Sequence, residues 1–141
     1  MLYFDTSALL KIIRIEPETV ALRAYLRDHA EQTHVSSALI RAEVARTVLR
    51  EADADGVPDQ RLVTAAQRAV GQLMLWRVSD DVLQATWDVP GPHVRALDAI
   101  HVATALRIHE QVSLSAFVTY DKRQADAAQA AGLTVASPRA T

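Results

Sequence analysis

The chain has 141 residues, half of them hydrophobic, and a formal net charge of −2. This length suits one domain with a core of ordinary size, so we expect residues 1–141 to form a single domain. Cysteine is absent, which excludes disulfides and thiolate zinc sites and favours a reducing, cytoplasmic location. Charges recur along the whole chain, so no segment has the roughly 18 consecutive apolar residues of a membrane span.

The first part of the chain alternates between strand and helix patterns. Residues 2–4 predict a strand, and Ser7 predicts the N-cap of a helix over residues 8–13. Pro17 suits the first turn of an amphipathic helix, and a weaker strand pattern follows at 33–36. This order is typical of an α/β protein.

Two helices are expected next. Ser37 predicts the start of a helix from Ala38 to about Ala52. Gly56 can end this helix and Pro58 can open the following one, which covers residues 59–72. We therefore interpret the break as an interhelical turn and not as a domain linker.

The second half of the chain continues the alternation. The patterns predict a strand at 74–78, a helix capped by Ser79, a rigid loop at 89–93, a helix at 97–110, a strand at 116–119, a helix over 122–131 ending at Gly132, and a strand at 133–135. Strands that alternate with helices in this way predict a three-layer α/β/α sandwich with a mostly parallel central sheet.

Four acidic residues lie where the predicted elements change. Asp5 and Asp121 follow predicted strands, and Glu43 and Asp98 lie near the starts of predicted helices. Open α/β sheets bind ligands outside the carboxyl ends of their strands, so acids there are functional candidates. Mg²⁺ and Mn²⁺ prefer hard oxygen ligands. A cation held by these acids could polarise a phosphodiester and acidify a water molecule, which is the chemistry of hydrolytic phosphoryl transfer.

Each acid also has a purely structural interpretation. Asp5 and Asp121 can cap helices, Glu43 can pair with Arg46 three residues on, and Asp98 can complement a helix dipole. The prediction of a metal site therefore depends on the whole set and not on any single residue.

Other polar and aromatic residues are interpreted as bystanders. Asp126 suits a solvated helix position, and Trp76 and Trp87 suit the core or its rim. Imidazole ligation is not favoured, because the chain has no His-Glu-x-x-His or similar pair. We expect His101 to pack or to form hydrogen bonds beside the acidic residues.

Four segments in order resemble the PIN-domain family, and most closely the VapC-type toxins of bacterial toxin–antitoxin pairs. The segments are Leu2–Leu9, Ser36–Glu43, Leu97–Ala105 and Phe117–Arg123, and the resemblance continues to Val135. It implies a compact α/β/α fold and a Mg²⁺- or Mn²⁺-dependent endoribonuclease.

The resemblance also implies a role for each acid. Asp5, Glu43, Asp98 and Asp121 match the acidic quartet of the family one by one. Asp5 and Asp98 would be the chief metal ligands, directly or through water, and Glu43 and Asp121 would complete the shell. Thr119 matches a polar position that supports the acids by hydrogen bonding.

The family resemblance further implies protein and RNA partners. The usual protein partner is a small VapB-type antitoxin whose C-terminal segment occupies the cleft, and an Arg of that partner can pair with the carboxylates. Family members also form homodimers. Basic residues that flank the acidic segments are candidates for RNA contact, with Arg41 and Arg95 first: Lys11, Arg14, Arg41, Arg46, Arg50, Arg95, Lys122 and Arg123.

Two other kinds of protein also carry an acid after the first strand, but their further motifs are absent from this chain. A haloacid-dehalogenase phosphatase needs a second acid two residues after Asp5, where this chain has Ser7, and a receiver domain needs an acidic pair and a lysine that are missing. A non-catalytic PIN-like module remains the alternative, in which the acidic cleft binds a basic partner by charge.

Overall fold

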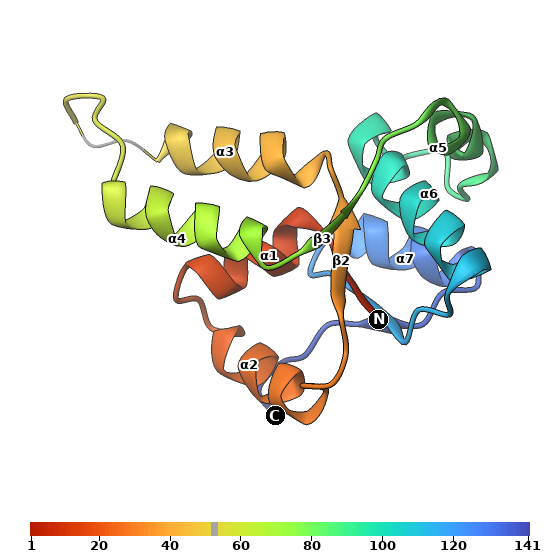
Figure 1. The fold of residues 1–141 in the computed structure, drawn as a ribbon, viewed down its shortest axis with the longest axis horizontal. Coiled ribbons are helices and arrows are strands. Elements are labelled where there is room, and N and C mark those ends of the chain that lie inside the picture. Colours follow the sequence, from red (N-terminus) through yellow and green to blue (C-terminus); the bar gives the residue numbers. More distant parts are fainter. Residues whose placement is uncertain (52–53) are drawn as a thin grey trace.

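Five strands form one sheet in the computed structural model, which describes residues 1–51 and 54–141 (Figure 1). The strands are β1 (Leu2–Phe4), β2 (His34–Ser37), β3 (Met74–Trp76), β4 (Ala116–Val118) and β5 (Val135–Ala136). Their order across the sheet is β3-β2-β1-β4-β5, and all four pairings of these strands are parallel. The predicted parallel sheet is confirmed.

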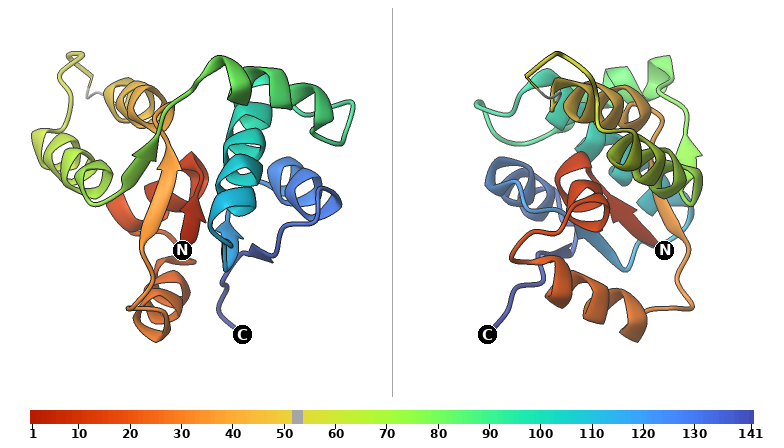
Figure 2. Two further views of the ribbon diagram at one scale, coloured as in Figure 1. Left: turned by 45° about the vertical axis from the view of Figure 1, so that its right-hand side comes forward. Right: turned by 90° about the vertical axis from the view of Figure 1, so that its left-hand side faces the viewer.

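Helices cover both faces of this sheet. They are α1 (Thr6–Ile13), α2 (Thr19–Asp28), α3 (Ile40–Arg50), α4 (Gln60–Gly71), α5 (Asp80–Ala85), α6 (Ala96–Gln111) and α7 (Lys122–Ala130), with a 3₁₀ turn at Thr86–Asp88. Figures 1 and 2 show α1 to α4 on one side of the sheet and α5 to α7 on the other. The predicted three-layer α/β/α sandwich is therefore confirmed. None of the helices within the described residues is long and apolar enough to cross a membrane.

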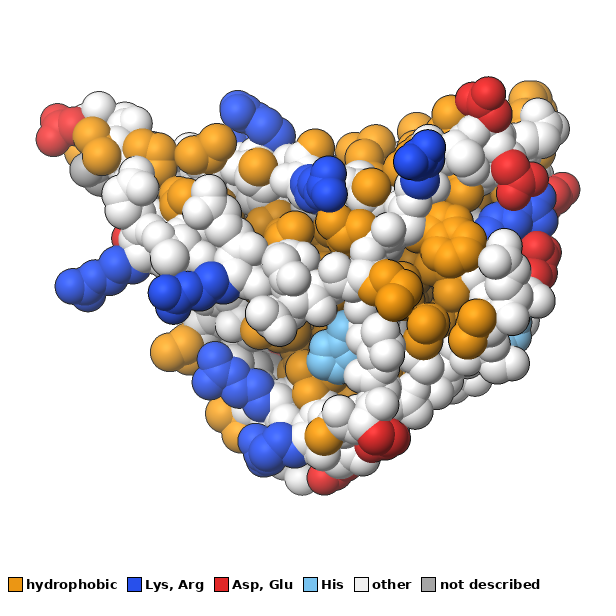
Figure 3. Space-filling model, in the orientation of Figure 1, with side chains coloured by type: hydrophobic (Ala, Val, Ile, Leu, Met, Phe, Trp, Pro, Cys, Tyr) orange, Lys and Arg blue, Asp and Glu red, His pale blue; other side chains and the backbone are white. Residues whose placement is uncertain are grey.

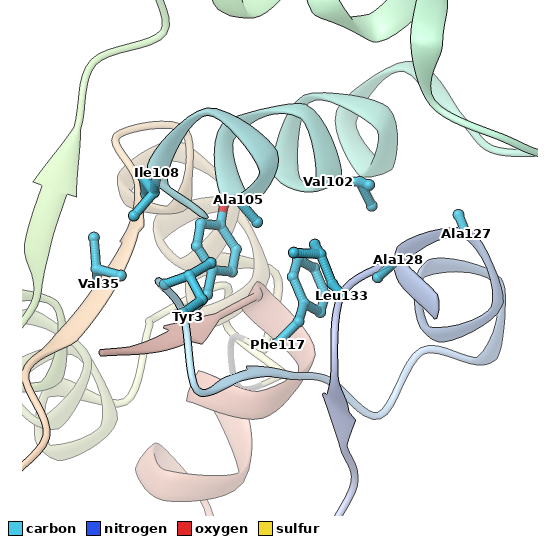
Figure 4. Packing of buried hydrophobic residues seen from close by; sticks show 10 residues of the cluster. Tyr3, Val35, Val102, Ala105, Ile108, Phe117, Ala127, Ala128 and Leu133 are labelled. Carbon is cyan, nitrogen blue, oxygen red and sulfur yellow. The ribbon is translucent and has the colours of Figure 1, made fainter. Parts of the chain in front are cut away.

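Strand β1 lies at the centre of the sheet and is buried on both faces. Leu2 and Phe4 pack in the cluster that includes α1 and α2, whereas Tyr3 packs in the cluster beneath α6 and α7. This alternation follows from the period of two residues in a strand. Tyr3 stacks on Phe117 of β4 with ring centroids 4.9 Å apart, and Figure 4 shows both rings in the core below α6.

The starts of two helices differ from the predictions. Asp5, and not Ser7, caps α1, because its carboxylate accepts a hydrogen bond from the backbone N–H of Ala8. The helix α3 begins at Ile40, two residues later than predicted, because Ser37 still belongs to β2. The Ser37 hydroxyl accepts a hydrogen bond from the Leu39 N–H in the connecting turn. By contrast, Ser79 caps α5 as predicted.

Several predicted ends also shift. The helix α3 ends at Arg50, so Gly56 lies in the following turn and is not its stop. The predicted end near Ala52 falls outside the described residues. Strand β3 ends at Trp76, before residues 77–78. The last strand is Val135–Ala136 instead of 133–135, because the Leu133 N–H bonds back to α7 after the positive-φ turn at Gly132.

The order of the strands reverses direction next to β1. The chain runs from β1 outward through β2 to β3, and then returns to place β4 on the other side of β1. The segment after β1 enters α1 on one face, and the segment after β4 enters α7 on the opposite face (Figure 1). Such a reversal opens a crevice at the carboxyl ends of the two strands. Asp5 and residues 119–121 lie at this place.

Candidate metal centre

Asp5 is the most enclosed of the four acids, with no solvent exposure. Its Oδ1 accepts hydrogen bonds from the Ser7 hydroxyl at 2.7 Å and the Ala8 N–H at 2.9 Å. Its Oδ2 lies 2.5 Å from the Thr119 hydroxyl, which donates to it, and 2.8 Å from Ser7 Oγ. Burial raises the pKa of Asp5, and these hydrogen bonds oppose the rise. The donors hold the carboxylate in one orientation.

Thr119 joins Asp5 to Asp121. The Thr119 hydroxyl donates to Asp5 Oδ2 and accepts a hydrogen bond from the Asp121 N–H at 3.0 Å. Asp121 caps α7, since its Oδ1 accepts a hydrogen bond of 3.0 Å from the Gln124 N–H. One buried hydroxyl at the end of β4 therefore fixes the positions of two acids that are far apart in the sequence.

Asp98 lies in the first turn of α6 and faces the start of α7. Its Oδ1 accepts a hydrogen bond of 3.0 Å from the side-chain amide of Gln124. Burial raises the pKa of Asp98, and the negative charges of Asp121 and Glu43 raise it further. Because such effects act over a few ångströms in a protein, Asp98 belongs to one electrostatic cluster with those two acids.

Glu43 reaches the cluster from the first turn of α3. Its Oε1 accepts a hydrogen bond of 2.8 Å from the Thr6 hydroxyl at the start of α1, and lies 2.5 Å from Nε2 of His101. His101 is fully buried one turn after Asp98 on α6. The expectation that His101 forms hydrogen bonds beside the acids agrees with this geometry.

The structure thus brings together all five residues singled out from the sequence: Asp5, Glu43, Asp98, Thr119 and Asp121. The sequence interpretation missed Gln124, which contacts Asp98 and Asp121. A signal for it was present, because an N-cap acid followed three residues later by Gln has the pattern of a capping box. The missed residue Thr6 gives no comparable signal.

The donor atoms suit a hard divalent cation. Glu43, Asp98 and Asp121 each use one carboxylate oxygen for hydrogen bonds to the protein, and the other oxygen receives none from the described residues. Gln124 Oε1 is buried beside Asp98 and has no hydrogen-bond partner in the described part of the chain. A buried acceptor without a hydrogen bond lowers the stability of the folded state. The unpaired Gln124 Oε1 is therefore consistent with a site in which a bound ligand supplies the missing donor.

The arrangement is looser than a closed ligand cage. Among residues 1–51 and 54–141, no group of three or more His, Asp or Glu side chains lies close enough to enclose one ion directly. Mg²⁺ keeps several of its waters and uses few direct carboxylate ligands, so water-mediated contacts are compatible with this spacing.

The basic residues considered for RNA contact fall into two groups. Lys11 pairs with Glu16 and Glu18, and Arg14 with Glu16 and Glu51, so these two are held by neighbouring acids. Others are exposed: Arg41, Arg46, Arg50, Arg95, Lys122 and Arg123. Figure 3 shows Lys and Arg side chains dispersed over one face of the molecule and not gathered in a single patch. Lys122 pairs with Asp126 on the surface, as the bystander interpretation of Asp126 requires.

Two features define the class of protein. A parallel five-stranded sheet lies between two helical layers. Asp5 and Asp121 follow its central strands, and Glu43 and Asp98 come from the first turns of α3 and α6. The model of the PIN domain matches residues 2–130, and the chain therefore belongs to the PIN-domain family. The resemblance inferred from the sequence is confirmed.

Relatives of nearly the same length are ribonucleases by name. The chain is 37% identical to Ribonuclease VapC35 of Mycobacterium tuberculosis over 98% of this chain and 97% of the relative. It is 41% identical to Ribonuclease VapC46 of the same species over 97% of each chain.

Two solved structures share the fold. FitAcB from Neisseria gonorrhoeae aligns with a TM-score of 0.71 and 19% identity over 98% of each chain. VapBC2 from Rickettsia felis, bound to a DNA fragment from its promoter, aligns with a TM-score of 0.66 and 15% identity over 96% of this chain and 98% of that one.

Proposed function

We propose that this protein is a divalent-metal-dependent endoribonuclease that acts as the toxin of a toxin–antitoxin pair, with residues 1–141 forming one PIN domain. The observation that carries the proposal is the hydrogen-bonded network that links Asp5, Asp121 and Asp98 through Thr119 and Gln124, with the charge of Glu43 acting on Asp98. The ribonuclease names of full-length relatives support the choice of RNA as substrate.

Each residue of the network has a defined part in this proposal. A bound Mg²⁺ or Mn²⁺ would supply Lewis-acid polarisation of the phosphodiester and a more acidic water. Asp5 and Asp98 bind the cation directly or through water, and Glu43 and Asp121 complete its surroundings. Thr119 holds Asp5 and Asp121 in fixed positions relative to each other, because its hydroxyl forms a hydrogen bond with each of them.

The proposed partners follow from the same site. A VapB-type antitoxin would silence the enzyme by placing an Arg among the carboxylates, because a guanidinium pairs with clustered acids in a bidentate manner. The names of both structural neighbours, VapBC2 and FitAcB, support a partner of this class. We also propose a homodimer as the free form of the toxin.

Incubation of the purified chain with total RNA tests the catalytic proposal. With Mn²⁺ or Mg²⁺ we expect endonucleolytic cleavage that leaves 5′-phosphate and 3′-hydroxyl ends, and with excess EDTA we expect none. Sequencing of the new ends identifies the RNA. Full activity in EDTA would exclude the metal-dependent mechanism, and metal binding without any cleavage would favour the non-catalytic binding module.

Induction of the gene in a bacterial host tests the toxin assignment. We expect growth arrest that is relieved when the small protein encoded beside it is co-expressed. Normal growth with a protein that cleaves RNA in vitro would contradict the toxin role while leaving the ribonuclease activity intact.

A further inference from the structure

We propose that His101, held in place by its hydrogen bond to Tyr3, is a positioning residue that orients Glu43 so that its Oε2 is presented to the metal centre. This inference rests on the proposed function, because it assigns a task within the same site. Neither Tyr3 nor His101 was predicted to have such a task from the sequence.

A chain of three hydrogen bonds connects Ser37, Tyr3, His101 and Glu43. The Ser37 N–H donates to the Tyr3 hydroxyl over 3.1 Å, and the hydroxyl lies 2.8 Å from Nδ1 of His101. Since the hydroxyl already accepts from Ser37, its own proton is available for Nδ1.

The second nitrogen of His101 acts as a donor to Glu43. Nε2 lies 2.5 Å from Glu43 Oε1. A carboxylate oxygen accepts hydrogen bonds, so Nε2 donates to it. The hydrogen bond at Nδ1 fixes the orientation of the ring and therefore the direction of this donor.

Burial separates this chain of hydrogen bonds from any substrate. Tyr3 and His101 have no solvent exposure, and both ring nitrogens of His101 are engaged. The Tyr3 ring is stacked on Phe117 and meets the His101 ring edge-on at 81°. Figure 4 shows the Tyr3 ring below α6, the helix that carries His101. His101 therefore acts through Glu43 and not on the RNA.

Both protein donors to Glu43 converge on one oxygen. Thr6 approaches Oε1 from α1 and His101 approaches it from α6, whereas Oε2 accepts no hydrogen bond from the described residues. Two donors on one oxygen fix the carboxylate plane, so Oε2 has one defined direction. Partners of this kind in metal sites affect ion affinity about 10- to 100-fold.

Nuclear magnetic resonance detects the donor directly in the metal-free, full-length protein. Long-range ¹H–¹⁵N spectra should show a proton on Nε2 of His101, with the signal assigned by its loss in His101→Gln. An Nε2 without a proton would overturn the proposal, because it could not donate to Glu43.

Calorimetric titration with Mn²⁺ tests the positioning role. His101→Leu should weaken Mn²⁺ binding about 10- to 100-fold. His101→Gln should bind within about threefold of the unmodified protein, because its amide can still donate to Glu43. The exposed His93→Gln serves as a control and should leave binding unchanged.

The outcomes separate this inference from the proposed function. If the unmodified protein binds no Mn²⁺, the metal site and this inference fail together. If it binds Mn²⁺ and His101→Leu, folded by circular dichroism, binds equally well, only the positioning role fails. Equal weakening in His101→Leu and His101→Gln would also overturn it, because the donor to Glu43 would then be irrelevant.

Discussion

Replacement of Asp5 by Asn is expected to lower the rate of RNA cleavage at least about a thousandfold while the fold is retained. Such a loss corresponds to about 4 kcal/mol of transition-state stabilisation, which is the scale of the contribution of a catalytic metal ion. Asn keeps the size of the side chain and one oxygen for the Ala8 N–H, so the cap of α1 survives. What it removes is the buried negative charge between Ser7 and Thr119.

The measurement is single-turnover cleavage of a defined RNA in Mn²⁺, with far-ultraviolet circular dichroism as the check on folding. Asp126→Asn is the matched control, because Asp126 is a surface acid that pairs with Lys122. This control should retain its full rate. A folded Asp5→Asn protein with unchanged cleavage would show that Asp5 serves only as a helix cap.

Stabilisation by Mn²⁺ should depend strongly on pH. At a concentration 100 times its Kd, a ligand that binds only the folded state adds about 2.7 kcal/mol to the free energy of unfolding. We expect a gain of this size at about pH 7.5 and a smaller gain at about pH 5. Protons compete with the cation for carboxylates, so metal binding weakens as the acids take up protons.

In the metal-free protein, the contribution of Asp5 and Asp98 to the free energy of unfolding should change with pH in the opposite direction. Burial raises the pKa of Asp5, and burial with the charges of Asp121 and Glu43 raises that of Asp98, in each case above the ordinary value of 3.8. The folded state therefore binds protons before the unfolded state does as pH falls. The contribution of both acids opposes folding at neutral pH, and this penalty is relieved as pH falls through the raised pKa values.

Urea unfolding with and without Mn²⁺ at the two pH values measures both effects. Asp98→Asn is the informative variant, because it removes one charge from the cluster and keeps an oxygen for Gln124. In the metal-free state it should be more stable at neutral pH by about 0.5 kcal/mol, the size of a partly exposed charge interaction. Equal stabilisation by Mn²⁺ at both pH values would argue against carboxylate ligation.

The architecture was predictable because hydrophobic alternation and helix signals are local. Strand β1 and the long helix α6 stand out by their apolar patterns, and their order implies a parallel sheet. The ends of the helices and strands were less predictable, since several neighbouring residues can serve as the N-cap of one helix. Asp5 displaced Ser7 as the cap of α1, and Ser37 remained in β2 instead of starting α3. These choices depend on neighbouring strands that a local pattern does not contain.

The candidate site was only partly predictable for a related reason. Acids at strand ends are conspicuous, and the resemblance to PIN domains placed all four. Tyr3 instead has the pattern of a core aromatic, and its task depends on contact with His101, which lies 98 positions further along the chain. The capping-box pattern relates Gln124 to Asp121, but the hydrogen bond from its side-chain amide to Asp98 is visible only in the structure.

Isothermal titration of the metal-free protein with Mn²⁺, repeated for Asp5→Asn, Glu43→Gln, Asp98→Asn and Asp121→Asn, tests the central claim that these four carboxylates form one metal centre. We expect saturable binding to the unmodified protein, a loss of at least about tenfold in affinity for every variant, and the largest losses for Asp5 and Asp98. Binding that is absent from the unmodified protein, or that is equally tight in all four folded variants, would contradict the account.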